Sequence, residues 1–154
     1  MRQHNREPCG KQLALREIDH ETLVESIIIR EPLELNAHEL VLELTRLGTA
    51  DARPVSLSRH IFPVRRLPRL HMALLAHPTI TGALVSIAIT DYVRLRSRII
   101  CRMPTVTEAA LFGMKRDAPV LHCENVTNTN TATAAIPLEL CLIIYPSPRV
   151  SLMV

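Results

Sequence analysis

Residues 91–113 read DYVRLRSRIICRMPTVTEAALFG and hold the clearest strand in the chain, followed directly by the clearest helix. Over residues 91–102 the side chains alternate, because successive residues of a strand point to opposite faces of a sheet. One face carries Tyr92, Arg94, Arg96, Arg98, Ile100 and Arg102, and the other carries Val93, Leu95, Ser97, Ile99 and Cys101. The pattern predicts a strand with one cationic face and one dry face.

The helix that follows this strand is marked at both ends. Thr105 stands in the N-cap position, and Glu108 stands three residues later, as in a capping box. Gly113 is a typical C-terminal residue. We therefore expect a helix over residues 106–112.

The rest of the chain alternates short strand patterns with short helix patterns. Strands are predicted over 38–47, 55–62, 120–126, 138–145 and 150–154, with a hairpin turn at 49–54 and a polar turn region at 127–135. Helices are predicted over 70–76 and after Thr79, which is a plausible N-cap. Residues 21–29 fit either a short helix or a buried strand that ends at Pro32. This succession indicates an α+β fold, an antiparallel sheet flanked by short helices.

The chain has 154 residues, which is enough for one domain. Residues 1–20 are polar and are interpreted as a tail or linker. Residues 1–10 contain no apolar stretch that could act as a signal peptide, and the chain contains no run of about 20 apolar residues of the kind that spans a membrane. We therefore expect a cytoplasmic protein with no membrane partner.

The net charge of +3 hides a strong asymmetry. Residues 1–51 carry a net −4, residues 52–102 a net +8 and residues 103–154 a net −1, and every basic group of the middle third is arginine. Forked guanidinium groups favour carboxylate, phosphate or phosphonate partners. Nucleic acid would match the charge, but the sequence lacks the aromatic platforms that bind single strands. The arginines could equally be a solvated surface or a subunit contact, and the acidic first third could be their partner.

Catalytic and metal-binding patterns are not evident. The four cysteines and seven histidines are widely spaced, with no zinc-ligand motif, so we expect reduced thiols, no metal and no cofactor. No nucleophile motif or close pair of carboxylates is present either. An enzyme would have to rely on arginine to stabilise an anionic substrate.

Several segments, taken in order, resemble the UTRA effector-binding domain of GntR-type (HutC subfamily) bacterial transcriptional regulators. They are LELTRLGTADARPVSLSRHIFPVRRLPRL (42–70), HPTITGAL (77–84), DYVRLRSRIICRMPTVTEAALFG (91–113), APVLHCENV (118–126) and IPLE, with Tyr145 and Arg149. The ADxRPVS turn and the DYxR strand look most like regulators of phosphonate metabolism. The resemblance covers residues 35–154 and leaves residues 1–34 as an N-terminal tail or linker.

The resemblance implies a chorismate-lyase-like fold, a homodimer and a pocket for a small anionic effector. In similar proteins that bind phosphosugars, the positions of the pocket residues match Arg46, Thr79, Glu139 and Tyr145. Arg46 can fork onto an oxyanion, and Thr79 offers a hydroxyl at a helix start. Glu139 and Tyr145 can hydrogen-bond the rest of a ligand. Each also has a plain structural reading: a surface residue for Arg46 and Glu139, a helix cap for Thr79 and a core aromatic for Tyr145.

The sequence also departs from the family pattern. Gly48 stands where many relatives have a second basic residue, so Arg96 or Arg98 would have to supply it; Ile144 and Pro148 replace an arginine and an acidic residue. No winged-helix DNA-binding domain is recognisable, so DNA would be bound only through a domain absent from this chain. We expect an effector-sensing domain of a transcriptional regulator, not an enzyme. The alternatives are a chorismate-lyase-like enzyme acting on a small dicarboxylate and a ligand-free dimerisation module.

Overall fold

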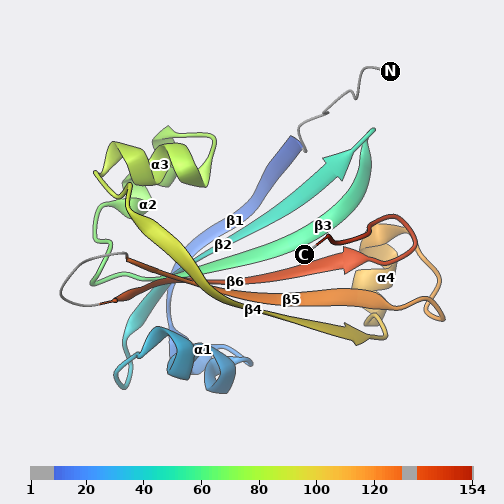
Figure 1. Cartoon of the computed structure of the whole chain (residues 1–154), viewed down its shortest axis with the longest axis horizontal. Helices are drawn as coiled ribbons and strands as arrows, with labels where there is room; N and C mark the ends of the chain where they lie inside the picture. The colour runs from blue at the N-terminus through green and yellow to red at the C-terminus, as the bar shows by residue number, and fades with distance from the viewer. Residues whose placement is uncertain (1–8, 130–134, 154) are drawn as a thin grey trace.

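A six-stranded antiparallel sheet forms the centre of the computed structural model, which describes residues 9–129 and 135–153 (Figure 1). The strands are β1 (Cys9–Asp19), β2 (Leu40–Ala50), β3 (Arg53–Pro63), β4 (Tyr92–Arg102), β5 (Val120–Thr129) and β6 (Pro137–Pro146). Their order across the sheet is β1-β2-β3-β6-β5-β4. The expected antiparallel α+β fold is confirmed.

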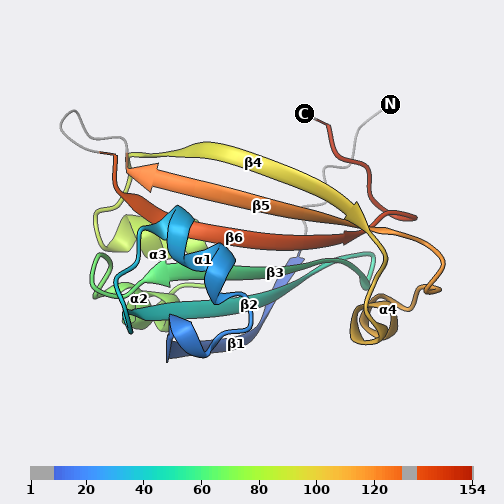
Figure 2. The ribbon, with the colours of Figure 1, turned by 90° about the horizontal axis from the view of Figure 1, so that it is seen from below.

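Helices cover both faces of this sheet. They are α1 (Ser26–Leu33), α2 (Leu70–Ala76), α3 (Ile80–Ser86) and α4 (Val106–Phe112), together with the short 3₁₀ turn η1 (His20–Thr22). Helices α2 and α3 lie over one face, α1 lies on the other, and α4 sits at the far end of the sheet (Figures 1 and 2). None of the helices in the described ranges is long and apolar enough to cross a membrane.

Two apolar cores follow from this arrangement. Under α2 and α3, Leu42, Leu44 and Phe62 are at most 2% exposed. Under α1, Val41 and Ile61 are fully buried from the same two strands. The alternation of leucine with other residues over 40–45 is typical of a half-buried strand, but Val41 and Glu43 are buried as well. Helix α1 covers the face of Val41, while α2 and α3 cover the face of Leu42 and Leu44.

The local turn and cap predictions are confirmed. The hairpin between β2 and β3 turns at Asp51 and Ala52, both with positive φ. The Thr79 side chain accepts a hydrogen bond from Gly82 N and caps α3. Thr105 and Glu108 form the expected capping box, and Gly113 ends α4 with φ 58°.

The N-terminal third was predicted least well. Of the expected tail, residues 9–19 form β1, which pairs along its length with β2; residues 1–8 lie outside the described ranges. Residues 20–34 supply η1 and α1, and Pro32 lies inside α1 instead of ending it. The structure therefore places residues 9–34 within the domain and not in a linker. Strand β1 lies at the edge of the sheet, where strands are often polar and charged, so its sequence does not show the apolar pattern of a central strand.

Three further predictions about strands and turns need correction. Residues 150–153 form no strand. The polar turn region at 127–135 falls partly in β5, and residues 130–134 lie outside the described ranges. The dry face predicted for residues 91–102 is also wrong. Leu95 is 61% exposed and Ile99 45%, because β4 is an edge strand that no helix covers.

A bulge in β4 rearranges the arginine ladder. Arg94 pairs with Thr127 but Arg96 pairs with Val126, so Leu95 is the extra residue. The shift by one residue moves all later side chains to the opposite face. Arg94 therefore faces the α2–α3 side, whereas Arg96 and Arg98 face the α1 side with Val126. The single cationic face predicted from the sequence does not exist.

Candidate ligand-binding cleft

Two adjoining cavities lie between the sheet and α3. We call the first the Arg46 hollow, which measures about 270 Å³, and the second the Glu139 cavity, which measures about 240 Å³. His60, Ile80 and Thr81 line both of them, so the two form one continuous cleft. A cleft of this size, part apolar and part polar, is typical of small-molecule sites.

The Arg46 hollow collects an arginine and several hydroxyl groups. Arg46 on β2 pairs with Ser58 on β3, so both side chains point to the same face of the sheet. Ser56, two residues before Ser58 on β3, lines the same hollow. Thr79 contributes its hydroxyl from the start of α3. None of the residues that line this hollow carries a carboxylate, so its charge favours an anion.

Two glycines make room for polar groups of the hollow, Gly10 for the Arg46 guanidinium and Gly48 for the Ser56 hydroxyl. A Cβ on Gly10 of β1 would stand 2.6 Å from Arg46 Nη2, so a larger residue would displace the guanidinium. A Cβ on Gly48 would overlap the Ser56 hydroxyl. The departure noted at Gly48 thus has a packing reason, since Ser56 occupies the space a basic side chain would need. Arg46 Nη1 also donates to the Pro78 carbonyl oxygen at 3.2 Å, which ties β2 to the start of α3.

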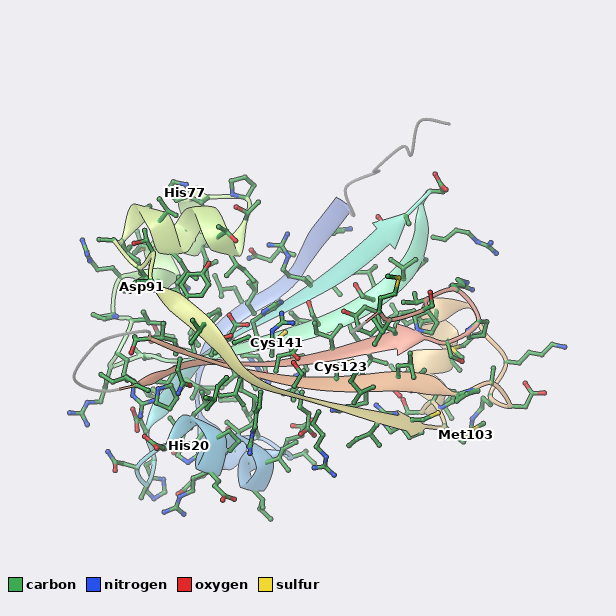
Figure 3. All side chains as sticks on the ribbon, in the orientation of Figure 1. His20, His77, Asp91, Met103, Cys123 and Cys141 are labelled. Carbon is green, nitrogen blue, oxygen red and sulfur yellow. The ribbon has the colours of Figure 1, made fainter. Side chains whose placement is uncertain are left out.

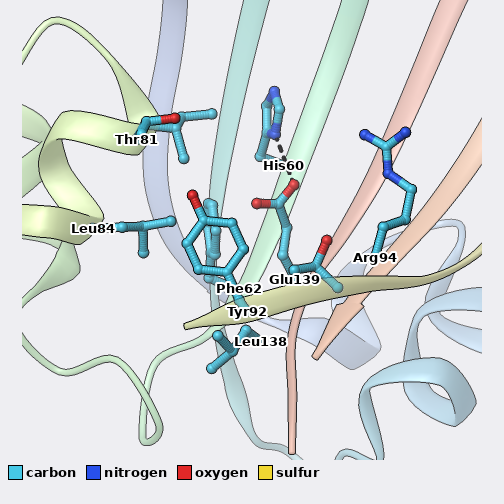
Figure 4. A pocket seen from close by; sticks show the side chains of 10 residues that line it. His60, Phe62, Thr81, Leu84, Tyr92, Arg94, Leu138 and Glu139 are labelled. Atoms are coloured by element: carbon cyan, nitrogen blue, oxygen red, sulfur yellow. Dashed lines mark hydrogen bonds and ion pairs between the residues drawn. The ribbon is translucent and has the colours of Figure 1, made fainter. Parts of the chain in front are cut away.

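The Glu139 cavity has a different character. Phe62, Leu84 and Leu138 form an apolar wall, while Tyr92 and Arg94 reach in from β4. His60 Nδ1 lies 3.1 Å from Glu139 Oε1 (Figure 4). The His60 Nε2 atom lies 3.0 Å from Ser58 Oγ, so His60 links the two halves of the cleft.

The structure brings together three of the six residues predicted for the site. Arg46 and Thr79 line the Arg46 hollow, and Glu139 lines the adjoining cavity. Tyr145 lies on the same face of β6, six residues beyond Glu139 and opposite Leu121, and lines neither cavity. Burial raises the pKa of its hydroxyl.

Arg96 and Arg98 are separated from the cleft by the sheet itself. Both line a hollow on the α1 side, where Arg98 lies 3.9 Å from Glu124. The β4 bulge explains this placement, because it turns both side chains away from the face of Arg46. The expectation that they supply the second basic group in the cleft is wrong on geometric grounds, and Arg94 is the β4 arginine that lines it.

Several cleft residues escaped the sequence analysis. His60, Ser56 and Ser58 alternate along the predicted strand 55–62, and that alternation was the available signal. Thr81 carried no comparable signal. Tyr92 and Arg94 belong to the DYxR strand, but which arginine of that strand enters the cleft depends on the β4 bulge. Gly10 was assigned to a tail.

Cysteine and histidine side chains also converge at the floor of the cleft. His60 pairs with Cys141 across β3 and β6, and Cys141 Sγ lies 4.0 Å from His60 Nε2. Cys123 and Cys141 are buried free thiols near the middle of the sheet, whereas Cys101 is an exposed free thiol (Figure 3). Burial raises the pKa of Cys141 far above that of an ordinary thiol.

Solved structures with this fold define the class of protein. The effector domain of PhnF from Mycobacterium smegmatis superposes with a TM-score of 0.74 at 21% identity, covering 94% of this chain and 83% of that one. A GntR-family regulator from Enterococcus faecalis gives 0.78 at 14% identity, covering 95% and 99%. The ligand-binding domain of a GntR-family regulator from Bordetella bronchiseptica gives 0.76 at 22% identity, covering 96% and 94%. The fold is therefore that of the effector domains of GntR-type regulators.

The family follows from the sequence match. The model of the UTRA domain matches residues 9–151, and the chain belongs to the UTRA domain family. The match begins with β1, in agreement with the structure. An uncharacterized HTH-type transcriptional regulator of Rhizobium meliloti is 25% identical over 114 residues, which are 74% of this chain and 46% of that protein. This chain thus matches about half the length of that relative.

Proposed function

We propose that this domain senses a small anionic metabolite, with a phosphonate or phosphorylated compound favoured, and transmits its binding to the DNA-binding domain of a cytoplasmic GntR-type regulator. The observation that carries the proposal is the Arg46 hollow, where a guanidinium and the hydroxyls of Ser56, Ser58 and Thr79 meet without a lining carboxylate. Guanidinium and hydroxyl donors together suit a tetrahedral oxyanion.

The donors remain suited to a ligand after their internal contacts are counted. A guanidinium carries five N–H donors, and the bond to Pro78 fixes Arg46 without exhausting them. Thr79 Oγ1 accepts from Gly82 N, so its own hydrogen can still donate to an oxyanion. The hollow therefore offers donors on both its sheet side and its α3 side.

The Glu139 cavity would hold the rest of the effector. Glu139 accepts hydrogen bonds from hydroxyl or amino groups, and Arg94 offers a further cationic contact at the side of β4. The apolar wall formed by Phe62, Leu84 and Leu138 favours a short carbon skeleton between polar ends. The matching compound has an oxyanion, which the Arg46 hollow would bind, and a hydrogen-bond donor, which Glu139 would accept.

The signal of effector binding would be transmitted because the cleft is lined by the sheet on one side and by α3 on the other. A ligand held by Arg46 on β2 and by Thr79 and Thr81 at α3 favours the conformation in which α3 lies closest to the sheet. Such differential binding shifts the population between two arrangements of the domain. In a homodimer, the shift would change the spacing of attached DNA-binding domains.

Calorimetric titration with a panel of phosphonates, phosphosugars and dicarboxylates tests the proposal. We expect at least one phosphonate or phosphate compound to bind, and Arg46→Ala to weaken it by about 10- to 100-fold, the loss of one to two charge-assisted hydrogen bonds. Arg116→Ala, which removes an exposed arginine outside the cleft, is the matched control and should bind as the wild type does.

Three results would contradict the proposal. Unchanged affinity in Arg46→Ala would remove Arg46 from the site. Product formation from a dicarboxylate would favour the lyase alternative. If a stably folded dimer binds none of the compounds in the panel, a ligand-free dimerisation module would be favoured.

A further inference from the structure

His60, Glu139 and Cys141 form a cluster of three different donor types at the floor of the cleft. One imidazole nitrogen, one carboxylate oxygen and the thiol sulfur all lie within 4.8 Å of one another. His60 Nδ1 lies 3.1 Å from Glu139 Oε1, and the other ring nitrogen, Nε2, lies 4.0 Å from Cys141 Sγ. The residues come from the paired strands β3 and β6, so the sheet fixes their spacing.

We propose that this cluster is a binding site for a divalent transition-metal ion of the Zn²⁺ type. Imidazole, carboxylate and thiolate are the three ligand types that Zn²⁺ takes in proteins, with bonds of about 2.0–2.3 Å. Ligand atoms around a tetrahedral ion with such bonds stand roughly 3.3–3.7 Å apart. An imidazole binds one ion through one nitrogen, and for such a set the three ligand atoms lie within 4.8 Å of one another, so the side chains must rotate inward to surround the ion.

The surroundings favour coordination over solvation. The side chains of His60 and Glu139 are 14% and 15% exposed, and Cys141 is 5% exposed. A carboxylate, a thiolate and a divalent cation sum to zero charge, so the ion and its anionic ligands add no net charge to the cavity that Arg94 lines. The thiol proton leaves to solvent when Sγ becomes a ligand.

Ser58 contacts the imidazole of His60 and holds it in place. Its hydroxyl oxygen lies 3.0 Å from His60 Nε2 and can accept a hydrogen bond from that nitrogen when Nδ1 binds the ion. Such a partner fixes the tautomer and the orientation of a metal-bound imidazole. His60 and Glu139 also line the cavity, so a fourth coordination position faces it and can take a water or an oxygen of a ligand.

The metal site does not rest on the proposed sensing function. Arg46 and Thr79 lie outside the cluster, and Cys141 lines neither cavity. His60 and Glu139 serve both proposals, but Arg46 serves only effector binding and Cys141 only metal binding, so each proposal can fail alone. Arg46→Ala tests effector binding, and Cys141→Ser tests metal binding.

Co²⁺ titration of the whole chain, kept reduced with a phosphine, is the direct experiment. We expect one Co²⁺ per chain and a thiolate-to-cobalt charge-transfer band in the near ultraviolet, both lost on addition of Zn²⁺. Cys141→Ser should abolish the band, and His60→Ala or Glu139→Gln should weaken Co²⁺ binding at least 10-fold. Cys101→Ser removes an exposed thiol on β4, and His38→Ala disrupts the exposed Asp19, Glu21 and His38 group; both controls should keep the band.

Two further measurements keep the outcome decisive. Circular dichroism establishes that each variant is folded, and the melting temperature of the wild type should rise with Zn²⁺, a rise that Cys141→Ser should lose. A wild-type protein without the band, or a band that survives Cys141→Ser, overturns the proposal. If the band fails while the effector panel still gives binding that Arg46→Ala removes, only the metal site is rejected.

Discussion

Glu43 joins the N-terminal segment to the sheet, and Glu43→Gln measures the strength of that connection. The carboxylate is 5% exposed on β2. It accepts from Arg16 Nε of β1 at 3.0 Å and from Arg59 Nη2 of β3 at 2.6 Å. Arg59 also donates to Glu25, just before α1, at 2.6 Å. This network ties β1, β2, β3 and the start of α1 together.

The size of the effect can be worked from these contacts. A hydrogen bond to a charged group contributes about 1.5–3 kcal/mol. The bond to Arg59 dominates, because the Arg16 side chain is 54% exposed and its pairing is screened by water. Glutamine keeps the shape and one acceptor oxygen, and Arg59 keeps Glu25. We therefore expect Glu43→Gln to lower the free energy of unfolding by about 2–3 kcal/mol at neutral pH, or the melting temperature by roughly 4–12 °C.

The stability difference between the wild type and Glu43→Gln should depend on pH, because the charge of Glu43 causes it. Burial alone would raise the pKa of Glu43, but the hydrogen bonds and charges of Arg59 and Arg16 outweigh burial and hold the pKa below its ordinary value. A carboxylate whose pKa is lowered by folding stabilises the protein above its unfolded pKa. The difference between wild type and Glu43→Gln should therefore be full at neutral pH and shrink as the pH falls through the folded pKa.

Urea unfolding at a series of pH values measures this difference. Glu31→Gln, an exposed carboxylate on α1, is the matched control and should change stability by no more than about 0.5 kcal/mol. Equal stability of Glu43→Gln and wild type at neutral pH would refute the reasoning. A difference that stays constant into acid would refute it as well, since the charge would then not be its cause.

Two other predictions concern the cap of α4 and the β4 arginines. Thr105→Ala removes the acceptor for Glu108 N at 3.1 Å and should lower the free energy of unfolding by about 1 kcal/mol, which thermal unfolding can measure; a melting temperature equal to that of the wild type would contradict it. Arg98→Ala should leave effector affinity unchanged in calorimetry, because Arg98 lies on the α1 side, whereas Arg94→Ala should weaken binding. A loss of affinity in Arg98→Ala but not in Arg94→Ala would contradict the assignment of Arg94 to the cleft.

Features encoded within a few residues could be predicted from the sequence. Helix α2 was predicted with its observed bounds, and the caps at Thr79 and Thr105 depend on one side chain and the next turn. Features that depend on distant partners were not predicted. Strand β1 has no dry face to mark it and becomes a strand only through its pairing with β2. The cover of α1 over Val41 could not be predicted from the alternation of residues 40–45 for the same reason.

The site was predicted in the same uneven way. Arg46, Thr79 and Glu139 were found because the family resemblance fixed their positions, and the structure places them along one cleft. Arg96 and Arg98 were chosen from the charge pattern, and a one-residue bulge invalidated that choice. His60 lies 79 residues from Glu139 and 81 from Cys141, so no spacing rule could have joined them.

Irregularities of the sheet decide the composition of the cleft wall. A regular strand sends neighbouring residues to opposite faces, so Leu138 and Glu139 could not both line one cavity. The register shift between β5 and β6, where Asn128 pairs with Pro137 and Thr127 with Glu139, lets both side chains reach it. The bulge in β4 places Arg94 in the same cavity and turns the next arginines away. Bulges of this kind re-aim side chains at the cost of local pairing. The cavity therefore owes its mixture of apolar wall, carboxylate and guanidinium to breaks in the two-residue period, and a strictly alternating β4 would have put Arg96 and Arg98 on the same face as Arg94.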